Sequence, residues 1–161
     1  MLYLVNAGTA TISLSGGKTL QLIVSGTNQY IKPYVDLILS WPSRVSGMSE
    51  MEVVDTTMRY IFSNYTYGAN GTLPMPYTKI GSCDGGNGLF EDLCETVGVS
   101  VEVVGAKPGH GGDGHVVSKV MIDGVPYMVD ASPFSEGWNI TESQIKKRIY
   151  TWERYEELYG N

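Results

Sequence analysis

The segment 115–130 reads HVVSKVMIDGVPYMVD, and it carries the clearest secondary-structure signal in the chain. Two runs rich in β-branched and aromatic residues flank a central Asp-Gly pair, which is typical of a two-residue hairpin turn. With such a loop, Val117 and Asp130 face each other across the two strands. His115 lies two residues from Val117, so its side chain is expected on the same face of the sheet as Asp130.

This hairpin predicts an imidazole and a carboxylate within hydrogen-bonding reach of each other. Diagonal neighbours on one face of an antiparallel pair have Cα atoms about 7–8 Å apart, which the side chains of His115 and Asp130 can bridge. A loop of three residues would change the parity and separate them. The alternative interpretation is a solvated aspartate and a structural histidine at the ends of the strands.

A second segment with reactive chemistry is 81–88, GSCDGGNG. Ser82 is a favourable N-cap, so Cys83 is expected at the start of a helix, where unpaired N–H groups and the helix dipole favour a thiolate. The glycines that follow leave few side chains around the sulfur and would let a substrate backbone approach. The alternative is a buried structural cysteine, which is the commoner fate of a free cysteine.

The other cysteine, Cys94, falls on the apolar face of the same predicted helix, with Phe90 and Leu93, and is expected in the core. In a helix over 83–97 that stops at Gly98, the two cysteines lie roughly 16 Å apart. A disulfide requires Cα atoms within about 7 Å, so at least one thiol should be free.

Helical periodicity dominates the part of the chain before these segments. A helix-like run covers 28–40, with Pro33 in its first turn, where proline is tolerated. Ser49 and Glu52 form a capping box that opens a second helix. The apolar positions of that helix are expected at Met51, Val54, Met58, Ile61 and Phe62, and a loop is expected at 64–77.

The rest of the chain predicts strands and a final helix. A β-branched run covers 99–104, and a glycine-rich loop covers 106–114. Thr141 and Gln144 form a second capping box, which predicts a helix with Ile145, Ile149, Trp152 and Tyr159 on one face. Helices that precede an antiparallel sheet indicate an α+β fold.

The first 28 residues predict a hairpin of their own. Residues 9–14 and 19–25 alternate in polarity around the turn SGGK at 15–18. The segment 1–28 is too short for an independent domain, so it is interpreted as an edge of the main fold or the remnant of an upstream β module. The remaining residues, 29–161, are expected to form one domain.

Composition excludes several classes of partner. The 161 residues include 11 Lys and Arg against 17 Asp and Glu, a net charge of −6. An acidic chain of this kind is not expected to bind nucleic acid or an anionic membrane surface. No apolar run approaches the ~18 residues of a membrane span. Residues 1–5 are too short and uncharged for a signal peptide, so we expect a cytosolic protein or a chain without its leader.

Several motifs along 46–133 resemble the bacterial transglutaminase-like superfamily. They are GMSEME at 47–52, GSCDGG at 81–86, LCETVGV at 93–99, the strand that begins at His115, and IDGVPYMVD at 122–130. The resemblance implies a papain-like α+β core in which a Cys-bearing helix packs on an antiparallel sheet. It also implies a catalytic triad in which Cys83 is the nucleophile, His115 the base and Asp130 the orienting acid.

The chain departs from the usual pattern of that family at several positions. Val116, Val117 and Ser118 follow the histidine, where the family usually has an aromatic residue and often an asparagine. Pro126 stands where a tryptophan is common. Asn87 replaces a small apolar residue.

The resemblance implies acyl transfer through a thioester on Cys83, with a peptide or a glutamine carboxamide as substrate. Water as acceptor would give a protease or deamidase, and an amine would give a cross-linking enzyme. The alternative is a surface binding module that keeps the fold without turnover. Relatives are often secreted or cell-surface proteins, so we expect an extracellular or cell-surface location and a protein or peptide partner associated with the cell wall, with the cytoplasm as the other option.

Neither a metal nor a cofactor is expected. The loop 110–115 contains two histidines and an aspartate, His110, His115 and Asp113, which could bind a metal ion. However, the two histidines have no third strong ligand nearby, and the chain has no known metal motif. The alternative role for this loop is to gate a cleft beside His115. The glycine pairs of the chain do not match a nucleotide-binding pattern.

Overall fold

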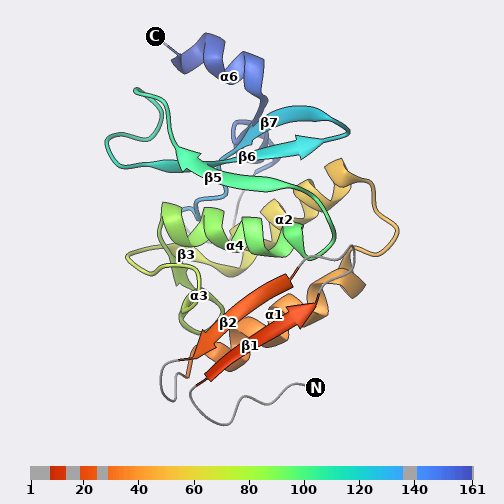
Figure 1. Cartoon of the computed structure of the whole chain (residues 1–161). Coiled ribbons are helices and arrows are strands. Elements are labelled where there is room, and N and C mark those ends of the chain that lie inside the picture. Colours follow the sequence, from red (N-terminus) through yellow and green to blue (C-terminus); the bar gives the residue numbers. More distant parts are fainter. Residues whose placement is uncertain (1–7, 14–18, 25–28, 136–140, 161) are drawn as a thin grey trace.

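The computed structural model describes residues 8–13, 19–24, 29–135 and 141–160. Figure 1 shows a layer of helices with a four-stranded sheet on one side and a separate two-stranded hairpin on the other. In chain order the elements are β1 (Gly8–Ser13), β2 (Thr19–Val24), α1 (Ile31–Arg44), α2 (Glu50–Asn64), β3 (Thr66–Tyr67), α3 (Met75–Thr78), β4 (Ile80–Gly81), α4 (Cys83–Glu95), β5 (Val101–Gly105), β6 (Val116–Ile122), β7 (Val125–Val129), α5 (Glu142–Lys146), β8 (Ile149–Thr151) and α6 (Trp152–Tyr159).

The main sheet has the strand order β5-β6-β7-β8, and all of its neighbouring strands are antiparallel. The β6–β7 turn consists of Asp123 and Gly124, which both have positive φ angles, 50° and 78°. Two residues of this kind form the type I′ turn expected from the sequence. The register pairs Ser118 with Val129, so the predicted parity of the hairpin is confirmed.

The core lies between this sheet and the helices. The capping box of Ser49 and Glu52 opens α2 as predicted, since the Ser49 side chain accepts from the Glu52 N–H and the Glu52 carboxylate accepts from the Ser49 N–H. One predicted core position is wrong, because Met51 is exposed. The fully buried large side chains are Trp41, Tyr65, Tyr155, Phe62, Phe90, Ile38, Met58, Ile61, Met75, Leu89, Leu93 and Met128.

The predicted loop at 64–77 contains more regular structure than expected. Thr66 and Tyr67 form β3, which pairs in parallel with β4. The Thr66 N–H donates to Lys79 O at 3.0 Å, and the Gly68 N–H donates to Gly81 O at 3.0 Å. This pairing fixes the chain directly before Ser82, and so positions the start of α4.

The predicted final helix is wrong in its length. The capping box of Thr141 and Gln144 is present, but α5 ends at Lys146 and a strand, β8, separates it from α6. Residues 149–151 pair with β7, and the Asp130 N–H donates to Arg148 O at 2.8 Å. A continuous helix would leave the open edge of β7 without these partners, so pairing overrides the helical period.

The N-terminal hairpin is confirmed, with Gly8 paired to Val24 and Ser13 to Thr19. Its predicted turn at 15–18 lies outside the described residues. The hairpin forms a sheet of its own, and the boundary between 1–28 and 29–161 stays a prediction.

Among the helices that the structure describes, none has the length and apolar character needed to cross a bilayer.

Candidate active site

Cys83 is the first residue of α4, as the sequence predicts. The Ser82 hydroxyl caps the helix by accepting from the Gly85 N–H at 3.1 Å. The Ser82 N–H in turn donates to Asn70 O at 2.8 Å, which fixes the approach to the helix. The Cys83 thiol is partly buried, and its N–H belongs to the first helical turn, where donors have no acceptor within the helix. The sulfur therefore lies at the positive end of α4.

The glycines after Cys83 have a different role from the one expected. Gly85 and Gly86 are both buried. A Cβ at Gly85 would collide with Asn70 O, and a Cβ at Gly86 would collide with Ala131 O. The protein's own backbone occupies the space, so the predicted approach of a substrate backbone over these two residues is wrong. Gly85 instead lets α4 pack closely on the segment at Asn70, and Gly86 lets it pack closely on the segment that follows Asp130.

His115 and Asp130 meet as the hairpin parity predicts. His115 Nε2 lies 3.2 Å from Asp130 Oδ2. With Nε2 protonated and donating to the carboxylate, Nδ1 of the ring keeps a lone pair and can accept a proton. The imidazole is therefore held in the tautomer that a general base requires.

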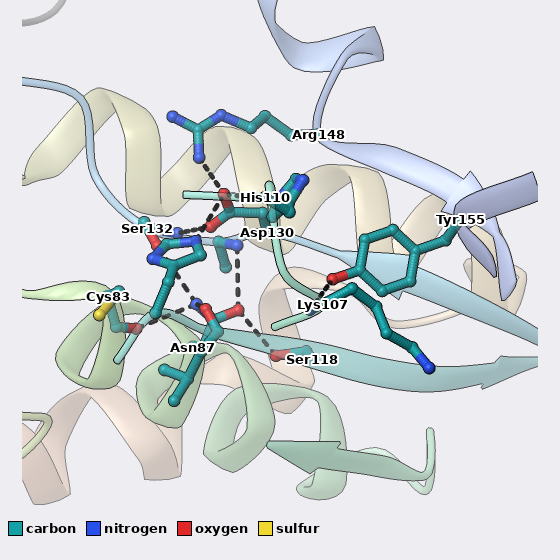
Figure 2. Close-up of polar contacts among 12 residues, drawn as sticks. Cys83, Asn87, Lys107, His110, Ser118, Asp130, Ser132, Arg148 and Tyr155 are labelled. Atoms are coloured by element: carbon teal, nitrogen blue, oxygen red, sulfur yellow. Dashed lines mark hydrogen bonds and ion pairs between the residues drawn. The ribbon is translucent and has the colours of Figure 1, made fainter. Parts of the chain in front are cut away.

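Asp130 is buried and carries several further contacts (Figure 2). Its Oδ1 accepts from the Ser132 N–H at 3.0 Å, its Oδ2 forms an ion pair with Arg148, and His110 Nε2 lies 3.5 Å from Oδ2. Burial alone would raise the pKa of Asp130, but the hydrogen bonds from the histidines, the charge of Arg148 and the Ser132 N–H outweigh it. They hold the pKa of this carboxyl well below its usual range, so it stays ionised.

His110 and Arg148 were not assigned to the triad from the sequence. The glycine-rich loop brings His110 into edge-to-face contact with the rings of Tyr155 and Tyr159, with centroid distances of 5.4 and 4.8 Å. The signal that could have found His110 was its place in that loop. Arg148 has no comparable signal, because it reaches the site only through the pairing of β8 with β7.

The histidines approach Asp130 and not Asp113, which is exposed. The ligand atoms of His110, His115 and Asp130 lie within 4.8 Å of one another, a spacing that can hold a metal ion. The Arg148 guanidinium already contacts the same carboxylate oxygen. A metal ion would have to displace it, so the donor set fits a cation only poorly.

Asn87 is a fully buried hydrogen-bonding centre between α4 and the sheet. Its Nδ2 donates to Cys83 O at 3.0 Å and to Val116 O at 3.1 Å. Its Oδ1 accepts from the Ser118 hydroxyl at 2.9 Å and from the Ala131 N–H at 3.1 Å. Figure 2 shows Asn87 between Cys83 and Ser118. The side chain thus ties the helix turn of the cysteine to the strand that follows His115.

Cys94 is a core residue, as predicted. It is fully buried, and its sulfur lies 3.8 Å from the Thr57 hydroxyl. Burial raises the pKa of the Cys94 thiol to about 12. Both cysteines are free, and Cys83 is the more accessible thiol because it is only partly buried whereas Cys94 is fully buried.

Comparison with known proteins identifies the fold. No family model and no curated protein match the sequence. The crystal structure of a TGase (a transglutaminase) is similar over 73% of this chain and 35% of its own, with 18% identity and a TM-score of 0.52. A putative cysteine protease from Cytophaga hutchinsonii matches over 78% of this chain and 61% of its own, with 13% identity and a TM-score of 0.48. This chain thus spans about a third of the length of the TGase, and it has the transglutaminase-like, papain-like α+β fold.

Proposed function

We propose that this protein catalyses acyl transfer through a thioester on Cys83, with His115 as general base and Asp130 as the residue that orients it. The observation that carries the proposal is the hydrogen bond of 3.2 Å between His115 Nε2 and the buried, ionised Asp130. Asn87 supports it, because this side chain joins the first turn of α4 to the strand beside His115. A thiol, a base and an orienting acid are the groups that cysteine acyl transfer needs.

In the first half-reaction, His115 Nδ1 takes the proton of the Cys83 thiol, and the sulfur attacks the carbonyl carbon of a peptide or glutamine carboxamide. The carbonyl oxygen gains negative charge, and the Cys83 N–H at the helix start is the proposed donor that stabilises it. As the intermediate collapses, the C–N bond breaks and the imidazolium gives its proton to the leaving amine or ammonia. The product is a thioester.

In the second half-reaction, His115 takes a proton from water or from an amine, which then attacks the thioester carbon. The C–S bond breaks, and the proton returns to the Cys83 sulfur. Water gives a carboxylic acid, so the enzyme would act as a protease or deamidase. An amine gives a new amide, so it would act as a cross-linking enzyme.

We place the protein at the cell surface or outside the cell, with peptide or protein substrates, and cell fractionation tests this placement.

The first experiment compares the reactivity of the two thiols. Native protein is treated briefly with iodoacetamide near neutral pH, and the labelled peptides are mapped by mass spectrometry. We expect labelling of Cys83 much faster than that of an ordinary free thiol, and almost none at Cys94, whose thiol is buried with a raised pKa. His115→Ala should slow the labelling of Cys83. Preferential labelling of Cys94, or labelling of Cys83 that is unaffected by His115→Ala, would contradict the proposal and favour a binding module.

The second experiment measures turnover once an activity probe and a peptide library have identified a substrate. Cys83→Ala and His115→Ala should each remove nearly all kcat/KM. Asp130→Asn should lose activity strongly, because the asparagine keeps the geometry but not the charge that stabilises the imidazolium. The double variant of His115 and Asp130 should be little worse than His115→Ala, because residues that act as one unit are not additive. Full activity of Asp130→Asn would exclude it as the orienting acid.

A further inference from the structure

A cavity of about 420 Å³ adjoins the His115–Asp130 pair. Both histidines of the chain line it, together with Lys147 and Arg148, and Tyr67 and Phe134 contribute aromatic rings to its wall. Cys83 is not among the lining residues. The cavity therefore lies on the imidazole side of the site, where it can hold a part of a substrate next to the reacting amide.

The charge of this cavity differs from that of the whole chain. The chain carries a net charge of −6, yet among the described residues that line the cavity Asp130 is the single acidic one. The Asp130 carboxylate is already neutralised by its ion pair with Arg148. Lys147 is exposed, and no hydrogen bond, ion pair or ring contact joins its side-chain ammonium group to another residue within the described part of the chain. Among the described residues, one full positive charge is therefore left at the cavity without a partner.

Arg148 adds hydrogen-bond donors to that charge. Its Nη1 contacts Asp130, and its guanidinium carbon lies 4.5 Å from the centroid of the Phe134 ring. These two contacts hold the planar group in one orientation. A guanidinium has five N–H donors, and the donors that Asp130 does not use form no hydrogen bond with another described residue. A fixed guanidinium beside a lysine is a favourable arrangement for binding a carboxylate.

We propose that this cavity binds a carboxylate group of a peptide substrate, with Lys147 supplying charge and Arg148 hydrogen bonds. The aromatic rings of Tyr67 and Phe134 would contact the apolar part of the same residue. This inference rests on the proposed function for the identity of the substrate as a peptide. The carboxylate can belong to an Asp or Glu side chain or to the carboxyl end of the peptide, and the experiment separates the two.

The test measures peptide binding to the full-length Cys83→Ala protein, so that no turnover occurs. Short peptides with a central glutamine carry Asp at one flanking position at a time, and matched peptides carry Asn there. Each pair is made with a free and with an amidated carboxyl end. Affinities come from fluorescence anisotropy at low and high salt. The variants are Lys147→Gln and, as the matched control, Lys146→Gln, which removes the neighbouring lysine that does not line the cavity.

At one flanking position, we expect the Asp peptide to bind roughly tenfold more tightly than the Asn peptide, because the carboxylate accepts charge-assisted hydrogen bonds. If the terminal carboxylate is the ligand, the free-end peptide has this advantage over the amidated one instead. Lys147→Gln should reduce the preference by about threefold to fivefold, and high salt should weaken it further. Lys146→Gln should leave the preference unchanged.

Equal affinity of the charged and uncharged peptides at every position overturns the proposal, and so does the absence of binding by either at millimolar concentration. An equal loss in Lys146→Gln and Lys147→Gln also overturns it, because the effect would then come from net charge. If the protein prefers carboxylate peptides but Cys83 is unreactive, the proposed binding site is supported and the acyl-transfer function is contradicted. If Cys83 is reactive but the preference is absent, the acyl-transfer function is supported and the binding site is contradicted.

Discussion

Replacing Asn87 by alanine removes the side chain that joins the two halves of the site. In the wild-type protein its Oδ1 accepts from the Ser118 hydroxyl and the Ala131 N–H, and its Nδ2 donates to Cys83 O and Val116 O. Asn87 itself is 0% exposed, and its contacts with Ser118 and Ala131 are fully buried, while those with Cys83 O and Val116 O are partly buried. The alanine variant leaves two buried donors without an acceptor and opens a small cavity.

The expected loss of stability follows from these contacts. A buried donor left without its acceptor costs about 1–3 kcal/mol, and the Ser118 hydroxyl can lower its own cost by rotating. The cavity adds a further penalty, so we expect a total of about 4 kcal/mol for Asn87→Ala. For a protein of this length, 1 kcal/mol shifts Tm by about 2–4 °C, so Tm should fall by about 8–16 °C.

Two matched variants separate the parts of this effect. Ser118→Ala removes one donor but leaves Asn87 Oδ1 bonded to the Ala131 N–H, so it should cost only about 1 kcal/mol. Asn87→Asp keeps the shape and both acceptor contacts but turns a carboxylate oxygen toward Cys83 O and Val116 O. It should be unstable at neutral pH and recover as the pH falls and the carboxyl takes up a proton, because a buried carboxyl without a cation has a raised pKa.

Urea unfolding followed by circular dichroism gives the free energies, and alkylation of Cys83 under native conditions gives the effect on the site. Asn87→Ala should slow alkylation more than Ser118→Ala does, because only the former releases the helix turn of Cys83 from the strand beside His115. A stability loss in Asn87→Ala no larger than that in Ser118→Ala would refute the reasoning. The hydrogen bonds of Asn87 would then contribute little to holding Cys83 and His115 in position, and the side chain would serve mainly to fill space.

Three other variants test separate parts of the structure. Gly111→Ala places a Cβ against the His115 ring at a residue with a φ of +80°, so Cys83 alkylation should slow markedly while unfolding in urea changes by only about 1–2 kcal/mol. Gly86→Ala drives a Cβ into Ala131 O and should cost about 2–3 kcal/mol in the same assay, and a neutral effect would show that α4 can move away. Burial raises the pKa of Asp92 from 3.8 to about 6, so an unfolded chain ionises this group at lower pH than the folded protein does. Wild-type stability should therefore fall by about 2 kcal/mol relative to Asp92→Asn between pH 4 and pH 6.5, and a constant difference across this range would contradict the assignment.

The features predicted correctly from the sequence are those that depend on near neighbours in the chain. The Asp123-Gly124 turn fixes the register of its hairpin by itself, and the register alone decides that His115 and Asp130 share a face. The N-cap of Ser82 likewise involves residues only three positions apart. In each case a few adjacent residues determine the geometry, so no knowledge of the rest of the fold is required.

The last third of the chain shows where this reasoning fails. The run from 141 to 159 has a helical spacing of apolar residues, and its capping box does form a helix, α5. The helix stops because 149–151 has a stronger alternative, the hydrogen-bonding edge of β7. That edge is supplied by residues about twenty positions earlier. The spacing of apolar residues within the segment 141–159 contains no information about that edge. The same pairing carries Arg148 to Asp130, so the error in secondary structure and the missed site residue have one cause.

Asn87 extends this argument from secondary structure to the site itself. A polar residue on the buried face of a helix breaks the apolar pattern, and from the sequence alone it counts as a departure from the family. In the structure it lies four residues after Cys83 and therefore one turn further along the same side of α4. From there it reaches the Val116 carbonyl, next to His115, and the Ala131 N–H, next to Asp130. One buried amide thus contacts the cysteine and the immediate neighbours of the other two proposed triad residues. Asn87 interrupts the apolar pattern of α4, and its hydrogen bonds hold Cys83, His115 and Asp130 at fixed positions relative to one another.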